Sequence, residues 1–260
     1  MRVQVLSSGS RGNATLLRAG DQTVLVDAGL GPRVMRARLE AAGVGLFGID
    51  HILVSHAHLD HSRSTGKIAR SYRATLHATE RNLGHRACAM AQSMATMPAN
   101  GTFKLNTKSG APIDVRTVTV PHDCDPTIGF RFEHEGRVLA HVTDLGEARD
   151  DLVRALVDPH VLVVESNHDL ELLATGPYPA ELKRRVAGPR GHLSNAQAAD
   201  LIAALAGPRL HTVVLAHLSE KNNTPELAVA AARAGLARRG REDVTVLVAA
   251  QDEVSALVKV

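Results

Sequence analysis

The sequence predicts an α/β fold in which two mixed β-sheets pack face to face between outer helices, a four-layer αββα sandwich. Two observations support this fold. Short apolar runs of strand length alternate with helix-like segments in two successive halves of the 260-residue chain. Five of these runs end in an aspartate or a histidine, as strands do at the carboxyl edge of a sheet that carries a site. With 44% hydrophobic and 22% charged residues, the composition is that of a globular protein with a substantial core.

The first half of the chain reads as a strand meander that continues into alternating helices and strands. Apolar runs predict the strands, and Pro32 at the start of a periodic segment with Gly43 after its end predicts the first helix. A cluster of Pro, Asn, Gly and Thr predicts a loop. The expected elements are strands at 2–7, 14–19 and 22–27, helices at 32–42, 65–72 and 79–94, and a loop at 97–111.

The second half repeats the pattern of strands followed by helices. Strands are expected near 113–120, 128–134 and 137–142, and a helix at 195–206 with Ser194 as its N-cap. No internal repeat, low-complexity tract or linker divides the chain. We therefore expect one domain that spans residues 1–260.

Four side chains of metal-binding type fall within six residues, directly after the apolar run 51–55. A strand cannot aim adjacent side chains at one point because they alternate between its faces, whereas a tight loop can. The alternative is a histidine-rich surface turn, which the preceding buried strand disfavours. His56 and His58 are expected to meet at one ion, and Asp60 and His61 to turn toward a second.

Two ions need more ligands than this loop holds, and four other apolar runs end in a suitable side chain. A histidine or an aspartate at the end of a strand can reach the same sheet edge as the loop. These residues are Asp27, His122, Asp144 and His217.

This order of motifs (Asp, His-X-His-X-Asp-His, His, Asp, His) resembles the metallo-β-lactamase superfamily over positions 27 to 217. The resemblance implies that His56, His58 and His122 hold one metal, and that Asp60, His61 and His217 hold the other. It also implies that Asp144 bridges the two metals and that Asp27 supports the ligand loop. Histidine and carboxylate ligands suit Zn, Mn, Fe or Ni, so the sequence leaves the metal open. The interval from Asp144 to His217 is too short for the extra domain of β-CASP nucleases.

Glu165 and His192 are not required for metal binding, and each follows an apolar or turn segment. A histidine held by a carboxylate beside two metals suggests a proton donor, which an alkoxide leaving group of a phosphodiester needs. The alternative is that both are ordinary polar residues at the ends of elements.

Together with their neighbours, Glu165 and His192 resemble the tRNA 3′-end-processing ribonucleases, although no exosite arm for tRNA is apparent. The sequences of four segments resemble the YycJ/WalJ-like group of bacterial metallo-hydrolases more closely. That resemblance implies a metal-dependent DNA nuclease with 5′-to-3′ exonuclease activity. The segments are residues 7–13, 165–169, 191–195 and 217–225.

The formal net charge of +3 suits an anionic partner, and the resemblance implies that this partner is nucleic acid, with DNA expected. Aromatic residues make up only 2%, so binding would depend on phosphates more than on base stacking. A solvated helix face is the alternative reading for the two basic residues among the expected contacts. The expected phosphate contacts are Ser8, Ser10, Asn13, Lys183, Arg184, Ser219, Asn222 and Asn223.

No run of 18 apolar residues predicts a membrane span, and the first residues read as a strand, so a cytoplasmic protein is expected. The two cysteines show no paired spacing, and Cys124, near His122, is expected to be a packed residue. Two other functions stay open. One is hydrolysis of a small molecule, either a cyclic phosphodiester or a thioester of the glyoxalase II kind. The other is a non-catalytic scaffold, which the complete ligand set disfavours. The sequence does not predict the oligomeric state.

Overall fold

The computed structural model describes residues 1–107 and 110–260. Contacts within the chain cluster into two compact units. The first unit comprises residues 1–117, 133–136 and 250–260, and the second comprises 118–132 and 137–249. The organisation as one domain therefore stays a prediction, and each unit is described by itself.

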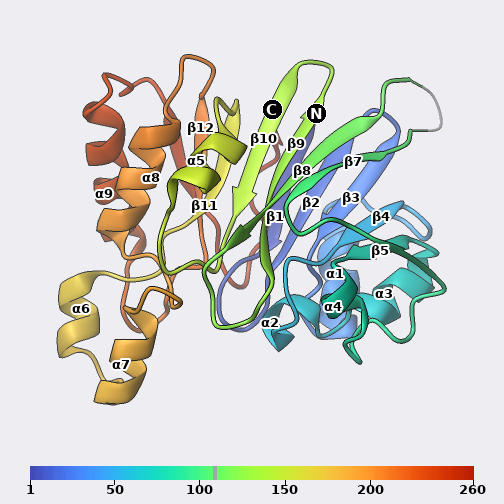
Figure 1. The fold of residues 1–260 in the computed structure, drawn as a ribbon, viewed down its shortest axis with the longest axis horizontal. Helices are drawn as coiled ribbons and strands as arrows, with labels where there is room; N and C mark the ends of the chain where they lie inside the picture. The colour runs from blue at the N-terminus through green and yellow to red at the C-terminus, as the bar shows by residue number, and fades with distance from the viewer. Residues whose placement is uncertain (108–109) are drawn as a thin grey trace. The chain divides into compact units, whose positions relative to one another are not determined.

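The first unit contains a seven-stranded sheet in the order β14-β1-β2-β3-β4-β5-β6 (Figure 1). Strands β1 to β3 form the predicted antiparallel meander, and β3 to β6 run parallel to one another. Each parallel connection returns through a helical segment, because parallel strands need a crossover. The bounds are β1 Arg2–Ser7, β2 Ala14–Ala19, β3 Gln22–Val26, β4 His51–Leu53, β5 Thr75–Ala78, β6 Ser93–Thr96 and β14 Val258–Lys259.

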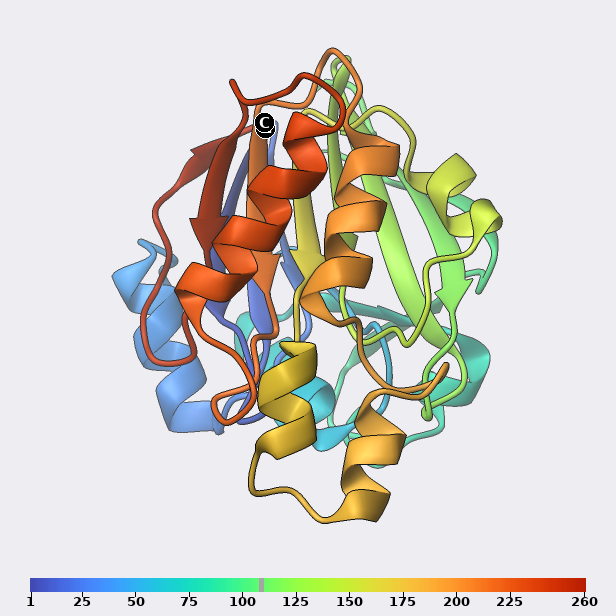
Figure 2. The same ribbon diagram turned by 90° about the vertical axis from the view of Figure 1, so that its left-hand side faces the viewer.

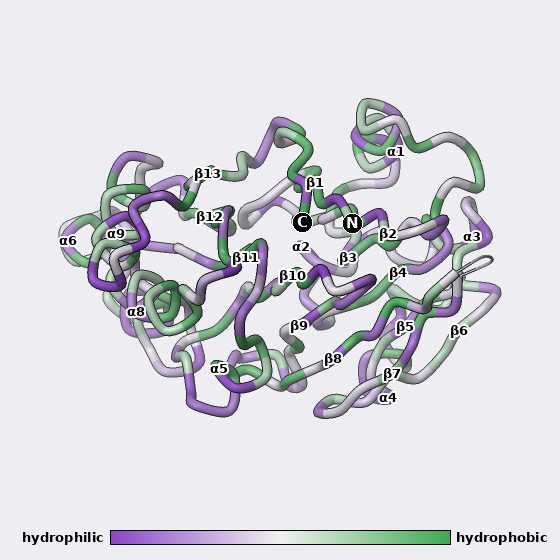
Figure 3. Tube along the Cα trace, turned by 90° about the horizontal axis from the view of Figure 1, so that it is seen from above, coloured by the Kyte–Doolittle hydropathy of each residue, from purple (hydrophilic) through white to green (hydrophobic). Residues whose placement is uncertain are grey.

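Four helices of the first unit cover this sheet from the connections, and their apolar sides form its core. Helix α1 buries Met35 and Leu39, and its trace alternates between hydrophobic and hydrophilic residues in Figure 3. Helix α3 buries Ile68 and Tyr72 and covers exactly the residues that the sequence predicted. The bounds are α1 Pro32–Ala41, α2 Leu59–Ser62, α3 Thr65–Tyr72 and α4 Glu80–Leu83.

Two predictions in this half of the chain were wrong. The helix expected at 79–94 is only the short α4, although Thr79 does cap it by accepting a hydrogen bond from the Asn82 N–H. Residues Ser93–Thr96 instead pair with β5 as strand β6, so tertiary pairing outweighs local helix preference. Within the loop expected at 97–111, Gly101–Leu105 forms strand β7, while residues 108–109 lie outside the described residues.

The second sheet runs in the order β13-β12-β11-β10-β9-β8-β7, and strands β10 to β13 lie wholly in the second unit. These four strands are parallel, so their carboxyl ends share one edge. That edge carries Glu165, the last residue of β11, and His217, which directly follows β12. The bounds are β7 Gly101–Leu105, β8 Ile113–Val120, β9 Thr127–His134, β10 Arg137–Val142, β11 Val161–Glu165, β12 Thr212–Ala216 and β13 Thr245–Val248.

Helices α8 and α9 lie side by side over the strands of the second unit (Figure 2), and their buried alanines and leucines join its core. Ser194 caps α8, as the sequence predicted, and the structure adds a complete capping box with Gln197. The stretch from Asp144 to His217 contains four helices and two strands. The bounds are α5 Asp150–Leu156, α6 Leu170–Thr175, α7 Ala180–Val186, α8 Asn195–Leu205 and α9 Pro225–Ala237. Among the described residues, no helix has the length and apolar character needed to cross a membrane.

A histidine pair, with His77 buried and His51 half-buried, lies within the first sheet. His51 Nδ1 on β4 and His77 Nε2 on β5 are 3.0 Å apart, and the His77 ring stacks on Phe103 with centroids 5.8 Å apart. Burial, and then the charge of His51, lowers the pKa of His77 to about 4. The folded protein therefore keeps His77 neutral at a pH where the unfolded chain would bind a proton.

We expect acid to destabilise the first unit through His77. As the pH falls from 6.5 toward 4, His77 becomes protonated in the unfolded chain but stays neutral in the folded chain. The free energy of unfolding therefore decreases over that pH range. At pH 4.5 the loss is on the order of 2 kcal/mol. Urea unfolding at pH 7 and 4.5 should show a smaller loss for His77→Asn than for the wild type, whereas His85→Asn should match the wild type. Parallel pH curves for wild type and His77→Asn would contradict this.

Candidate metal centre

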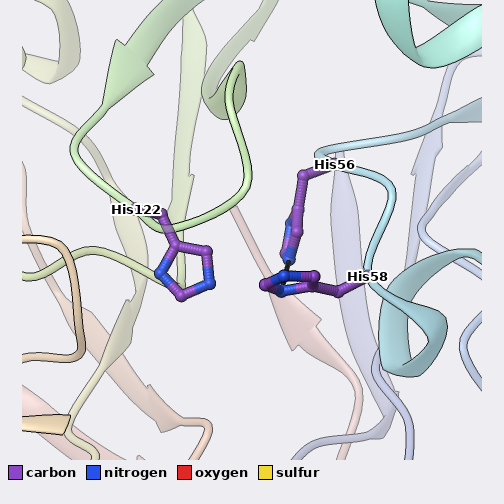
Figure 4. Close-up of side chains that lie close together, drawn as sticks. All are labelled: His56, His58 and His122. Atoms are coloured by element: carbon purple, nitrogen blue, oxygen red, sulfur yellow. Dashed lines mark hydrogen bonds between the residues drawn. The ribbon is translucent and has the colours of Figure 1, made fainter. Parts of the chain in front are cut away.

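In the first unit, the loop after β4 brings His56, His58, Asp60 and His61 together. His56 Nε2 lies 3.1 Å from His58 Nδ1, and Figure 4 shows the two nitrogens facing each other. The rings of His56 and His61 have centroids 4.2 Å apart, and His61 Nε2 is 3.7 Å from an Asp60 carboxylate oxygen. His56 and His61 are fully buried, so the four side chains converge within a protected loop, as the sequence predicted.

Asp27 fixes this loop from the end of β3. One carboxylate oxygen accepts hydrogen bonds from His61 Nδ1 at 2.8 Å and from the Ser55 hydroxyl at 2.7 Å. The other accepts from the Ser55 N–H at 2.8 Å. Because Nδ1 of His61 donates to Asp27, Nε2 is the nitrogen with a lone pair for a metal.

Gly29 lets the loop approach the turn after β3. A Cβ added at Gly29 would lie 1.6 Å from the Asp60 carbonyl oxygen, so only glycine fits. The Asn13 N–H donates to the same carbonyl at 2.7 Å, and the Asn13 amide nitrogen lies 2.9 Å from His61 Nε2. Asn13 is thus part of the scaffold of the ligand loop.

Replacing Asp27 by asparagine is expected to weaken metal binding by about 10- to 100-fold, the usual effect of losing a carboxylate that orients a histidine ligand. The asparagine amide has only one oxygen and no charge, so it cannot accept all the hydrogen bonds that His61 and Ser55 donate to the two carboxylate oxygens of Asp27. Asparagine tolerates the left-handed backbone at this position, where φ is 63°. Competition with a fluorescent chelator measures the affinity, and Asp50→Asn, which changes a carboxylate bonded to the Thr23 N–H, is the control. An unchanged affinity in Asp27→Asn would contradict the supporting role.

In the second unit, Glu165 is the centre of the site. Its Oε1 accepts hydrogen bonds from His192 Nδ1 at 2.8 Å and from His217 Nδ1 at 2.9 Å. Its Oε2 accepts from the Leu193 N–H at 2.9 Å. Glu165 is fully buried. The sequence predicted its pairing with His192 but not its pairing with His217.

The charges of this group are balanced within the second unit. Burial alone would raise the pKa of Glu165, but the charge of His192 and the hydrogen bonds from both histidines outweigh it, so the pKa is lowered. Burial alone would lower the pKa of His192, and the Glu165 carboxylate outweighs it, so that pKa is raised. The pair therefore favours a carboxylate beside an imidazolium.

Asp144, His217 and His122 follow three strands of the second unit, as predicted. Ligand atoms of Asp144, Glu165, His192 and His217 all lie within 4.8 Å of one another. His122 donates from Nδ1 to the Gly191 carbonyl at 3.0 Å, and its Nε2 lies 4.0 Å from an Asp144 carboxylate oxygen. Asp144 and His217 adopt φ values of 60° and 55°, in the left-handed region that non-glycine residues seldom take.

Histidine side chains in each unit are oriented as metal ligands. In His61, His122 and His217, Nδ1 is held by a protein oxygen, which leaves Nε2 as the ligand nitrogen. His192 differs because its side chain is 21% exposed, against 4% for His217. The partly exposed imidazole of His192 suits a proton donor, and the buried imidazole of His217 suits a ligand.

Most of the expected phosphate contacts have other partners. Ser219 Oγ accepts from the Asn222 N–H and side-chain amide, and Asn223 exchanges amide hydrogen bonds of 2.9 Å with Asn195. Lys183 donates from Nζ to the Ala174 carbonyl at 2.6 Å. Asn222 is fully buried and Ser8 is 5% exposed, whereas Ser10 and Arg184 are exposed. Phosphate binding by these residues stays a prediction, and Ser10 and Arg184 are the most accessible of them.

Sequence reasoning missed several residues that hold the ligands. Ser55 binds Asp27, and Asn167 donates from its amide to the His217 carbonyl at 2.8 Å. Both are neighbours of residues that were singled out, so their position next to a ligand motif was the available signal. Asp123 lies 3.2 Å from His122 Nε2, and no sequence signal separated it from a surface carboxylate.

A model of the metallo-β-lactamase superfamily matches residues 8–217. The chain belongs to the metallo-β-lactamase superfamily. It is a hydrolase of that superfamily, and its His and Asp clusters are of the kind that binds divalent metals. The predicted αββα fold class is thereby confirmed.

Several relatives of this chain are nucleases by name. It is 33% identical over 231 residues to the exodeoxyribonuclease YycJ of Bacillus anthracis, covering 88% of this chain and 86% of the relative. It is 31% identical to the exodeoxyribonuclease WalJ of Streptococcus pneumoniae D39, covering 87% and 85%. A ribonuclease Z of Mycobacterium bovis is 31% identical over 177 residues, covering 54% and 60%. The predicted similarity to the YycJ/WalJ-like group is confirmed.

Solved structures show the same fold at low sequence identity. YhfI of Bacillus subtilis, a metallo-β-lactamase fold protein, matches with a TM-score of 0.70 and 14% identity over 98% of this chain and 99% of that chain. The short form of human tRNase Z matches with a TM-score of 0.67 and 17% identity over the full length of both chains.

Proposed function

We propose that this protein is a DNA nuclease, a two-metal phosphodiesterase that removes nucleotides in the 5′-to-3′ direction in the cytoplasm. The observation that carries the proposal is the partly exposed His192, held 2.8 Å from the buried Glu165 carboxylate. A lactam or thioester does not need such a proton donor as strongly as an alkoxide does. The similarity to the exodeoxyribonucleases YycJ and WalJ supports DNA as the substrate.

The proposed metal ligands are those that the family motifs imply. His56, His58 and His122 would hold one ion, Asp60, His61 and His217 would hold the other, and Asp144 would bridge them. The orientation of His61, His122 and His217 by oxygens at Nδ1 supports this assignment. When bound, the ions supply positive charge for the phosphate and lower the pKa of a water molecule.

The remaining steps are performed by side chains of this protein. Asp60 orients the attacking water by accepting one of its hydrogen bonds. The water loses one proton to solvent and attacks phosphorus as hydroxide. The bond to the leaving oxygen breaks, and that oxygen takes the proton of His192 Nε2–H. Glu165 stabilises the imidazolium beforehand through Nδ1, so the imidazole carries the proton until the bond breaks.

The substrate class is tested by activity with the metal-reconstituted protein. A panel of Zn, Mn, Fe and Ni is offered with single-stranded DNA, bis-p-nitrophenyl phosphate and S-lactoylglutathione. We expect hydrolysis of both phosphodiesters and none of the thioester. Hydrolysis of the thioester alone would identify a small-molecule hydrolase and reject the proposal, and inactivity on all three with every metal would reject it as well.

DNA binding is expected to weaken as salt rises, because bound phosphates release counterions. Two phosphate contacts give a slope of about −1.4 for the logarithm of the single-strand binding constant against the logarithm of salt concentration. Fluorescence anisotropy of a labelled oligonucleotide between low and physiological ionic strength measures the slope. A flat dependence would count against a nucleic-acid substrate.

A further inference from the structure

Helices α6 and α7 form a hairpin that contributes little to the core of the second unit. Helix α7 buries no residue, and α6 buries only Leu173. In Figures 1 and 2 the two helices lie together at one end of the unit, beyond the ends of α8 and α9. Since burial of apolar surface is the main reason to keep a helix, a hairpin that buries almost nothing points to another use.

The hairpin is nevertheless held firmly. Lys183 Nζ donates to the Ala174 carbonyl at the end of α6, which ties α7 to α6. Asp169 caps α6 by accepting from the Glu171 and Leu172 N–H groups at 3.0 Å. Arg185 binds the Asp123 carboxylate, with its Nε 2.7 Å from the oxygen. The hairpin is therefore a fixed projection and not a loosely attached loop.

The end of α7 is also joined to the proton donor. The His192 N–H donates to the Val186 carbonyl at 2.9 Å. A Cβ added at Gly191 would lie 2.2 Å from the Arg185 and Val186 carbonyl oxygens, so only glycine lets the backbone lie against the helix end. A ligand bound on α7 would thus have a fixed position relative to His192.

The cations of this segment divide into two kinds. Arg185 is neutralised by Asp123, and Lys183 is bound to a carbonyl. The Arg184 side chain is exposed and makes no hydrogen bond or ion pair with the residues that the structure describes. Arg190 is exposed and uses only Nε, which donates to the His122 carbonyl at 2.9 Å. Two guanidinium groups therefore present donors that match the oxygens of a phosphate.

We propose that the α6–α7 hairpin is the docking surface for a single DNA strand, with Arg184 and Arg190 binding backbone phosphates beyond the scissile one. This proposal rests on the proposed nuclease function and specifies the part of the protein surface along which the DNA strand lies. A small phosphodiester would contact only His192 and the metals, whereas a DNA strand is long enough to contact the hairpin as well. Arg184 and Arg190 then act on the binding of long substrates and not on the chemical step.

The test compares Arg184→Glu with Arg239→Glu in the metal-reconstituted full chain. Both variants change the net charge equally, and Arg239 is an exposed residue just after α9, at the end of that helix away from the hairpin (Figure 2). We expect Arg184→Glu to raise KM for a 20-nucleotide strand about 10-fold or more, with kcat and the cleavage of bis-p-nitrophenyl phosphate unchanged. Arg184→Ala should reduce the salt slope of binding by about 0.7. Arg239→Glu should match the wild type.

Equal increases of KM in Arg184→Glu and Arg239→Glu would reduce the effect to overall charge and overturn the proposal. An unchanged KM in Arg184→Glu, with the wild type active on the same strand, would overturn it while leaving the nuclease function intact. Failure of the wild type to cleave any strand, with small diesters cleaved, would instead reject the nuclease function, and the docking surface with it.

Discussion

Replacing Asp144 by alanine is expected to remove both metals and nearly all activity. The side chain is 2% exposed, and one carboxylate oxygen lies 3.4 Å from His217 Nδ1 and 4.0 Å from His122 Nε2. As the proposed bridging ligand, it is the residue whose loss affects both ions. Loss of the charge stabilisation that the metals supply amounts to several kcal/mol, so we expect activity to fall by about 10³-fold or more.

Elemental analysis of the purified variants measures the metal per chain. His56→Ala is expected to lose one ion, because His56 is assigned to a single metal. Asp200→Ala is the control, since that carboxylate forms an exposed ion pair with Arg238. Retention of two ions per chain by Asp144→Ala would show that the bridging assignment is wrong.

Replacing His192 by alanine is expected to reduce DNA cleavage by on the order of 10²–10⁴, the usual contribution of a general acid. The effect should depend on the leaving group. The 3′- or 5′-alkoxide of DNA is strongly basic and needs a proton, whereas p-nitrophenolate does not. Cleavage of bis-p-nitrophenyl phosphate should therefore fall much less, and the metal content should not change.

Two other results would change the role of His192. Equal losses on DNA and on the p-nitrophenyl diester would make it a binding or structural residue. Loss of a metal would make it a ligand, and the assignment of His217 would then need revision. Its neighbouring contacts make this distinction necessary, because His192 and His217 have ring centroids 5.1 Å apart and share one Glu165 oxygen.

Glu165→Gln should combine two effects, because Glu165 holds both the proton donor and a proposed ligand. DNA cleavage is expected to fall less than in His192→Ala, and the affinity for metal is expected to fall as well, through His217. In the double variant, the ratio of DNA cleavage to cleavage of bis-p-nitrophenyl phosphate should be little lower than in His192→Ala alone. The reason is that the two residues act together on the transferred proton.

The ligand loop could be predicted from the sequence because its information is local. Four ligand-type residues directly after a buried strand can converge only in a turn, and the structure places His56, His58, Asp60 and His61 in that arrangement. The same reasoning located Asp144 and His217, since strand ends in parallel sheets gather at one edge.

The double role of Glu165 could not be predicted, because it depends on strand pairing across more than 50 residues. Strand β11 pairs with β12 in a register that sets Glu165 opposite Ala216, which places His217 beside the carboxylate. The amide pair of Asn195 and Asn223 joins the start of α8 to the loop before α9, a contact that the sequence does not show either. In the sequence, an asparagine in a polar loop looks the same whether it faces a phosphate or a buried neighbour.

The most direct test of the central claim is the hydrolysis of one single-stranded DNA labelled at either end, followed in time with the metal-reconstituted protein. A two-metal exonuclease of 5′-to-3′ direction should release the 5′ label at once in the smallest product, while the 3′-labelled strand shortens step by step. Internal fragments from both labels, release of the 3′ label first, or no cleavage with any of the four metals would contradict the account.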